Sequence, residues 1–201
     1  AHCLNHLPQG DLHTNSIDLL TESIANDFRG CESGDILLSH RDINAISVLD
    51  GDTYKIKQWF QGITSMQHDA DFLPGGRIVA FDNLGGQRLF ETGSRIVIFD
   101  ANSGGMEWIY QDPSTFFTRV RGSQNALPNG NVLITESNYG TIFEVTPDKE
   151  VVWKYRSLNQ AESLISDEEY IGIVKWAERY PRAYFEEDFA NAVPLRARDV
   201  K

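Results

Sequence analysis

Hydrophobic and polar residues alternate along short stretches of this chain, and turn signals separate one stretch from the next. Arg95–Asp100 and Thr141–Val145 mix apolar and polar side chains in the way that half-buried β-strands do. Pro-Gly-Gly at 74–76 and Pro-Asn-Gly at 128–130 favour hairpin turns, because proline fixes a corner while glycine and asparagine accept a positive φ. The pattern predicts an all-β protein of short antiparallel strands.

The strand pattern occurs three times in succession. Each unit contains four expected strands, and four strands in roughly 40–50 residues is typical of one blade of a β-propeller. A tryptophan recurs near the end of each unit, at Trp59, Trp108 and Trp153. A linear meander is the alternative, but the recurring tryptophan argues against it. The expected blade-like units are residues 11–60, 63–110 and 116–156.

Three units do not close a ring, because propellers have roughly 4–8 blades. We expect residues 1–201 to form a portion of a single propeller, with about three to four blades in this chain. A fragment that lacks upstream blades is favoured, and closure by oligomerisation, for example as a homodimer, is the alternative. The segment 157–201 is expected to be partly irregular, with a helix cap at 166–169, a strand at 170–177, a helical turn at 184–189 and a loosely held tail.

Composition and charge limit the class of protein and its partners. The chain is 41% hydrophobic and 23% charged, as globular proteins are, and its formal net charge is −11. Nucleic acids and anionic membranes bind basic surfaces, so neither is expected as the main partner. No apolar run reaches the roughly 18 residues of a membrane span, and no signal segment opens the chain. Cys3 and Cys31 are the only cysteines, and the sequence is compatible with a disulfide or with two separate thiols.

Candidate chemistry gathers at the start of the repeated units. His13 and His68 open two successive units, and Asn15 follows His13 by two residues, which places both side chains on one face of an extended chain. Arg41 follows an expected strand, and arginine suits the oxygens of phosphate or sulfate. An imidazole nitrogen can also attack an electrophile and carry it covalently. The simpler alternative is that each histidine only bonds a neighbouring backbone carbonyl.

Several motifs resemble the arylsulfotransferase family. The most specific are His13-Thr-Asn-Ser16 and Gln67-His-Asp69, which occur in this order with expected propeller strands between them. The resemblance covers nearly all of residues 11–155 and extends loosely through 176–181; its longest stretches are 11–17, 67–83, 122–134 and 143–155.

The resemblance implies a six-bladed propeller that transfers a sulfuryl group from a phenolic sulfate ester to a phenol acceptor, without the nucleotide donor PAPS. The family mechanism passes through a sulfated histidine and needs no metal or organic cofactor, and a periplasmic or secreted location is expected. His68 resembles the nucleophile, and His13 and Asn15 resemble the pair that binds the sulfuryl oxygens. Arg41 resembles an anion-binding arginine, and Ser123 a small hydroxyl residue of the site. His13 is also the expected proton donor and acceptor for the phenol.

One feature of the family has no counterpart in this sequence, because a further active-site histidine comes from an upstream blade. His2 and His6 carry no matching motif. Two other functions therefore stay open. One is a metal-dependent propeller hydrolase that uses Asp69, Asp71 and Asn83. The other is a non-catalytic propeller that binds peptides or glycans or has decayed from an enzyme.

Overall fold

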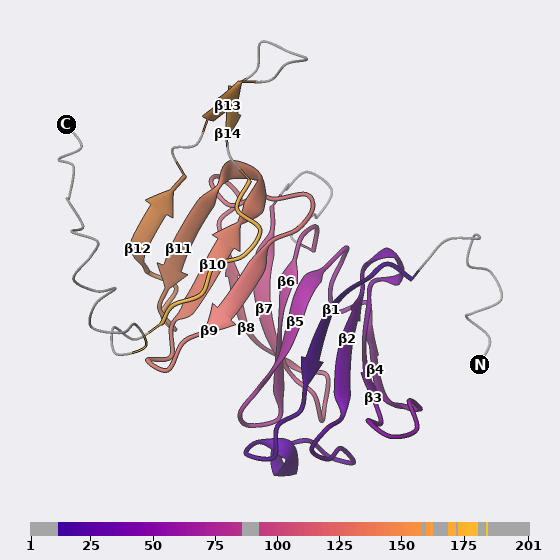
Figure 1. Ribbon diagram of the computed structural model, residues 1–201. Helices are drawn as coiled ribbons and strands as arrows, with labels where there is room; N and C mark the ends of the chain where they lie inside the picture. Colours follow the sequence, from indigo (N-terminus) through magenta and orange to yellow (C-terminus); the bar gives the residue numbers. More distant parts are fainter. Residues whose placement is uncertain are drawn as a thin grey trace.

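The computed structural model describes residues 12–85, 93–157, 160–162, 169–171, 173–180 and 184. Three four-stranded antiparallel sheets make up most of this part of the chain (Figure 1). In each sheet the strands pair in the order in which they occur in the sequence. Sheet one consists of β1 (Thr14–Leu19), β2 (Ile36–His40), β3 (Ala45–Leu49) and β4 (Ile56–Gln61).

The second and third sheets repeat this plan. Sheet two consists of β5 (His68–Leu73), β6 (Arg77–Asp82), β7 (Arg95–Asp100) and β8 (Met106–Gln111). Sheet three consists of β9 (Ser123–Ala126), β10 (Val132–Glu136), β11 (Thr141–Val145) and β12 (Val151–Arg156). Short 3-10 helices lie in the connections: η2 (Ala25–Asp27), η3 (Arg41–Ile43) and η4 (Ser137–Tyr139).

The first strands of the three sheets lie at the inner side of the arrangement. β5 packs against β1 on one side and against β9 on the other, so the sheets follow one another like blades around an axis (Figure 1). This is the architecture of consecutive propeller blades, and it confirms the predicted all-β propeller class. The recurring tryptophans lie in the outermost strands β4, β8 and β12, and Trp59 and Trp153 are about two-fifths exposed.

Hydrophobic side chains fill the spaces between neighbouring sheets. Between sheets one and two, Phe28 meets Phe72 edge to face with ring centroids 4.9 Å apart. Between sheets two and three, Phe116 contacts both Phe81 and Phe143 in the same manner, at 5.5 and 5.4 Å. Such aromatic pairs add roughly 0.5–1.5 kcal/mol each beyond the area that they bury. The two cores fix β1, β5 and β9 beside one another, which positions the residues considered below.

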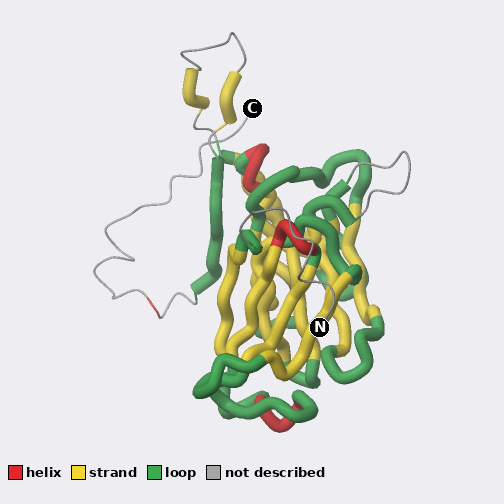
Figure 2. Tube along the Cα trace, turned by 90° about the vertical axis from the view of Figure 1, so that its right-hand side faces the viewer, coloured by secondary structure: helices red, strands yellow, loops and turns green. Residues whose placement is uncertain are grey.

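The C-terminal part differs from the sequence prediction. A two-stranded hairpin of β13 (Gln160–Glu162) and β14 (Glu169–Ile171) stands away from the three sheets (Figures 1 and 2). The strand predicted at 170–177 is wrong beyond Ile171, because residues 173–180 form no regular structure. Side chains hold this segment instead of a strand ladder: Asn125 Nδ2 donates to the carbonyl oxygen of Ala177 at 2.9 Å, and Arg179 pairs with Glu144.

Other predictions lie wholly or mostly outside the described residues. Tyr184 belongs to a 3-10 turn, but the rest of the predicted turn at 184–189 is not described, and neither are the tail or positions 166–168 of the predicted cap. The proposed partner Cys3 is also outside, so the disulfide with the half-buried Cys31 stays a prediction. No helix in the described part of the chain is long and apolar enough to cross a membrane.

Candidate active site

Two β-bulges shape the inner edge of the sheets. In β1 the pairing with β2 shifts between Thr14 and Ser16, so Asn15 is the extra residue. In β5 the pairing with β6 shifts between His68 and Ala70, so Asp69 is the extra residue, with φ of 50°. A bulge interrupts the alternation of side chains and re-aims one of them. The bulges interrupt both strands at the residues that line the cavity described below: Asn15 in β1, and the consecutive pair His68 and Asp69 in β5.

His68 is fixed in one tautomer by its hydrogen bonds. Asn83 Nδ2 donates to the carbonyl oxygens of Thr118 and Arg121, at 2.9 and 2.7 Å, which leaves Asn83 Oδ1 facing His68. His68 Nδ1–H donates to this oxygen at 2.7 Å. Nε2 consequently carries the lone pair, and it accepts only a long bond of 3.3 Å from the backbone N–H of Arg121.

The surroundings of His68 favour its neutral form. Burial lowers the pKa of His68, and the charges of Arg41 and His13 lower it further, against the hydrogen bond to Asn83. A neutral imidazole with an available lone pair is the form that acts as a nucleophile. The geometry therefore prepares Nε2 for attack on an electrophile.

A cavity of about 260 Å³ lies at His68. Its walls contain three residues predicted from the sequence, Asn15, His68 and Ser123, and five others: Asp69, Arg121, Gly122, Lys175 and Trp176. Asn15 Oδ1 and Ser123 Oγ are buried there without a hydrogen-bond partner. Buried polar atoms are nearly always paired, so a small shift of either side chain would let it bond a polar group in the cavity.

Asn15 is held by the residue that precedes His68. Asn15 Nδ2 donates to the carbonyl oxygen of Gln67 at 2.8 Å, and a primary amide has a second hydrogen left to donate. The Gln67 side chain is fully buried, and its Nε2 donates to Ser39 Oγ and to the carbonyl oxygens of His40 and Ala45. This network joins sheets one and two directly beneath the site.

His13 and Arg41 lie beside each other, but neither forms a wall of this cavity. The backbone N–H of Arg41 donates to the carbonyl oxygen of His13 at 3.1 Å. Asp42 lies between their side chains, 2.6 Å from Arg41 Nη1 and 3.7 Å from His13 Nδ1. The His13 side chain is half exposed, whereas Arg41 Nε is buried and unpaired. Their charges still act on His68, so both residues are near the site.

The neighbouring histidine, His40, is structural. Its Nδ1 is 2.9 Å from Thr14 Oγ1, its Nε2 is 2.8 Å from Ser47 Oγ, and its ring stacks on Trp59. Both ring nitrogens are thus occupied by hydroxyl groups of adjacent strands. The sequence places His40 next to Arg41 near the pocket, but the structure uses it to pin β2 between β1 and β3.

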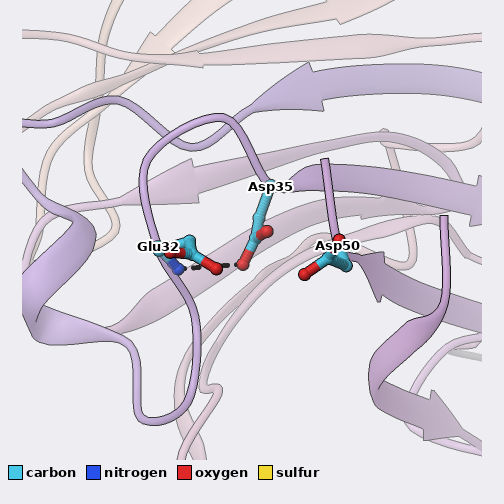
Figure 3. Close-up of side chains that lie close together, drawn as sticks. All are labelled: Glu32, Asp35 and Asp50. Carbon is cyan, nitrogen blue, oxygen red and sulfur yellow. Dashed lines mark hydrogen bonds between the residues drawn. The ribbon is translucent and has the colours of Figure 1, made fainter. Parts of the chain in front are cut away.

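Metal ligands gather elsewhere in the described part of the chain. The oxygens of Glu32, Asp35 and Asp50 lie within 4.8 Å of one another (Figure 3). Lys57 Nζ bonds all three carboxylates, at 2.9, 2.9 and 3.0 Å, so its ammonium group occupies the position of a cation. The metal-binding alternative from the sequence gains no support from its own residues, because Asn83 binds His68 and Asp71 accepts a bond from Gln124.

A larger cavity of about 290 Å³ lies between the loop at 113–117 and sheet three. Its charged walls are Glu136, Lys154 and Arg156, and it contains none of the residues predicted from the sequence. The Glu136 carboxylate is occupied, since it accepts the backbone N–H of Phe117 at 2.9 Å. Of these two cavities, only the smaller contains His68 and other residues predicted from the sequence.

Five residues that line the cavity at His68 were not predicted to share it: Asp69, Arg121, Gly122, Lys175 and Trp176. Arg121 belongs to no sequence motif of the site, and it lies with a positive φ of 66° in the connection that leads into β9. Lys175 and Trp176 come from the irregular segment 173–180, about 100 residues further along the chain than His68. The basic Lys175 and the aromatic Trp176 are adjacent in the sequence, but nothing in the sequence shows that the chain brings them back to the inner strands. Asp69 was considered only as a metal ligand.

Together the fold and the site define a class: a propeller-type protein with a neutral, oriented histidine at the inner end of a blade, in a cavity with cationic walls. A family model for arylsulfotransferase (ASST) matches residues 5–158. The chain belongs to the arylsulfotransferase family, which confirms the resemblance seen in the sequence. No curated protein matches the chain.

Three solved structures illustrate the similarity to known proteins. A protein of unknown function from Bacteroides caccae is 16% identical with a TM-score of 0.49, over 75% of this chain and 47% of that one. BamB from Moraxella catarrhalis is 22% identical with a TM-score of 0.43, over 63% and 34%. Hydrazine synthase of Kuenenia stuttgartiensis is 12% identical with a TM-score of 0.48, over 76% and 40%. The chain spans less than half the length of each of these structures.

Proposed function

We propose that the protein transfers a sulfuryl group from a phenolic sulfate ester to a phenol acceptor, through a covalent adduct on His68 and without PAPS. The observation that carries the proposal is the state of His68: its Nδ1–H is fixed by Asn83, its Nε2 accepts only the long bond from Arg121, and the residue lines a cavity with Asn15, Ser123 and two cationic side chains. Family membership supports the reaction class.

In the first displacement, Nε2 attacks sulfur and the aryl oxygen leaves. The sulfuryl oxygens need donors as charge shifts, and Asn15, Ser123 and Arg121 line the cavity where they would lie. Arg41 and His13 resemble the anion-binding residues of the family, and the Arg41 guanidinium adds positive charge from beside the cavity. In the second displacement the acceptor phenol attacks the same sulfur and restores the histidine. No step requires a metal or an organic cofactor.

Kinetics test this proposal. Two displacements through a covalent enzyme predict ping-pong behaviour with 4-nitrophenyl sulfate and a phenol, that is, parallel lines in double-reciprocal plots. His68→Ala is expected to lose at least about 10⁴-fold in kcat/KM, because the nucleophile is gone. Tyr54→Ala, which changes a side chain that is 68% exposed on sheet one, is the matched surface control. Intersecting lines, or full turnover by His68→Ala, would contradict the covalent route.

A second candidate function is a propeller that binds anionic ligands without turning them over. The cationic side chains of Arg121 and Lys175 favour it, since they would hold an anion in the cavity whether or not it reacts. Calorimetric binding of 4-nitrophenyl sulfate with no nitrophenol release would support binding alone.

Loss of activity after a chelator would favour the metal-dependent hydrolase. The periplasmic or secreted location and a homodimer stay predictions, which fractionation and sedimentation test.

A further inference from the structure

We infer that Asp69 is the general acid and base of the reaction: it gives a proton to the leaving phenolate oxygen and later takes one from the acceptor phenol. The inference rests on the proposed transfer through His68. It assigns the proton to a residue that the sequence motifs do not single out for this role, in place of His13.

Asp69 follows the nucleophile directly and shares its cavity. Adjacent residues of a strand normally point to opposite faces, but the bulge and the φ of 50° at Asp69 break this alternation, and both side chains line the same space. The backbone N–H of Gln124 donates to Asp69 Oδ2 at 2.8 Å. No hydrogen bond among the described residues holds Oδ1, so this oxygen is available to a phenol.

His13 is in a weaker position for the same task. Its side chain is half exposed, pairs loosely with Asp42 and is absent from the cavity walls. A proton donor must come within hydrogen-bond reach of the reacting oxygen, directly or through one water. The geometry therefore favours Asp69 over His13.

Burial and acidic neighbours raise the pKa values of Asp69 and Asp71, so both carboxyl groups hold a proton to a higher pH than usual. Burial raises the pKa of Asp69 to about 6, and Asp18, on β1, acts in the same direction. Burial raises the pKa of Asp71 to about 8, with Asp69 and Asp18 as further causes. Gln124 couples the two carboxyl groups, since its Nε2 donates to the carbonyl oxygen of Asp69 at 2.6 Å and to Asp71 Oδ2 at 2.9 Å.

The other charged side chains that line the cavity with Asp69 are positive. Arg121 precedes β9 and Lys175 comes from the segment 173–180, and both line the cavity with Asp69, as does the neutral His68. The Gln124 side chain beside the carboxyl groups is only 1% exposed, and its Oε1 has no hydrogen-bond partner. A protonated carboxyl group is a hydrogen-bond donor that could face such an oxygen, whereas a carboxylate could not.

The proton also explains how an anionic donor enters a cavity that contains a carboxyl group. An ionised Asp69 would repel the sulfate ester, while the protonated form does not and can donate to the bridging oxygen. As Nε2 forms the N–S bond and the S–O bond breaks, the released electron pair takes the proton from Asp69, giving phenol and a carboxylate. The carboxylate then accepts the proton of the acceptor phenol as its oxygen attacks sulfur and the N–S bond breaks. Protons and charge balance over the two steps.

A comparison of leaving groups in Asp69→Asn tests the inference. Phenolate is a poor leaving group that needs the proton, so turnover of phenyl sulfate should fall by about 100-fold or more. 4-Nitrophenolate is stable without a proton, so its release in the first displacement should fall less than about fivefold. Asp52→Asn, which changes an exposed carboxyl group in the β3–β4 turn, is the matched control and should alter neither rate.

The outcomes separate this inference from the proposed function. Equal losses for the two donors, with the covalent adduct still formed on His68, would overturn the role of Asp69 and leave the transfer intact. Absence of an adduct in the unchanged protein would instead remove the proposed function. If Asp69→Asn does not fold, the pH profile of the unchanged protein gives the answer. Release from phenyl sulfate should decline as pH rises above about 6, while release from 4-nitrophenyl sulfate does not, and parallel profiles would contradict the inference.

Discussion

The environment of His68 turns an ordinary side chain into a candidate nucleophile. Asn83 fixes its Nδ1–H, and the orientation of Asn83 is itself fixed by the carbonyl oxygens of Thr118 and Arg121. An outer partner of this kind sets which nitrogen of an imidazole carries the lone pair. Chemistry at Nε2 thus depends on a residue fifteen positions away, at the end of β6.

The pH dependence of the first displacement follows from the pKa of His68. Only the neutral ring attacks, so the rate rises with pH through this pKa, and burial places the midpoint below the usual value of about 6.5. Asn83→Asp keeps the acceptor but adds a negative charge, which favours the protonated ring and should move the midpoint upward by about one unit or more. Pre-steady-state bursts with 4-nitrophenyl sulfate between pH 4.5 and 8 measure this. An unchanged midpoint would show that another group limits the acid limb.

Gly122 illustrates a backbone requirement beside the nucleophile. Its φ is +101°, and an added Cβ would lie 2.6–2.8 Å from atoms of the Phe81 ring. Gly122→Ala should lower the free energy of unfolding by about 2–3 kcal/mol, since it combines backbone strain with a clash against a buried ring.

Gly104→Ala is the matched control for this substitution. Gly104 also has a positive φ, of +73°, but nothing lies within 4 Å of an added Cβ. Gly104→Ala should lower the free energy of unfolding by only about 1 kcal/mol, because backbone strain is its sole cost. Urea unfolding of both variants compares the two, and equal losses would mean that the contact with Phe81 is not limiting.

At the scale of elements, the segment 173–180 contributes the least expected part of the site. Arg179 anchors it twice, through its pair with Glu144 and through the Trp153 ring, whose centroid lies 5.6 Å from the guanidinium carbon. These contacts hold Lys175 and the 55%-exposed Trp176 at the cavity of His68. An exposed indole at a polar cavity suits the face of an aryl ring.

Trp176→Ala should therefore raise KM for aryl sulfates by about 10-fold, with a smaller effect on kcat, because stacking stabilises bound substrate and transition state alike. Trp176→Phe should recover most of the loss. Arg179→Ala should show a similar rise, since it releases the segment without touching the cavity. Steady-state kinetics measure these effects. An unchanged KM in Trp176→Ala would show that the segment 173–180 does not bind the aryl group.

The sheets themselves were predictable from the sequence, because alternation and turn residues act locally. Pro74-Gly75-Gly76 does connect β5 to β6, and residues 128–130 connect β9 to β10. The site was predictable in part: Asn15, His68 and Ser123 share one cavity, whereas His13 and Arg41 lie beside it. Arg121, Lys175 and Trp176 could not be placed, because turns and an irregular segment bring them in through tertiary contacts that carry no sequence period.

At the scale of the whole molecule, the acidic inner strands affect stability as well as chemistry. The folded pKa of Asp71 is raised above its unfolded value, so the folded state binds a proton more tightly, and stability is lost as pH rises from about 4 to about 8. Asp71→Asn removes this loss and keeps an acceptor for Gln124. Its melting temperature should exceed that of the unchanged protein by several degrees at pH 8.5 and by little at pH 4.5. A constant difference across pH would contradict the assignment.

The outer sheets of the described part leave apolar side chains uncovered. Ile17 and Leu19 on β1 are 67% and 55% exposed, and Val152 on β12 is 55% exposed. These strands belong to the first and third sheets, where a closed ring would place further blades. The family expectation of additional blades and a further histidine agrees with this surface and stays a prediction.

The central claim is that His68 carries the sulfuryl group. The direct measurement is to mix the protein with 4-nitrophenyl sulfate, quench the reaction rapidly without acid, and locate the modified residue by peptide mapping at alkaline pH and mass spectrometry. An added mass of about 80 Da is expected on the peptide that contains His68, and it should be lost again when a phenol acceptor is present. Turnover with no adduct on this peptide, or an adduct on another residue, would contradict it.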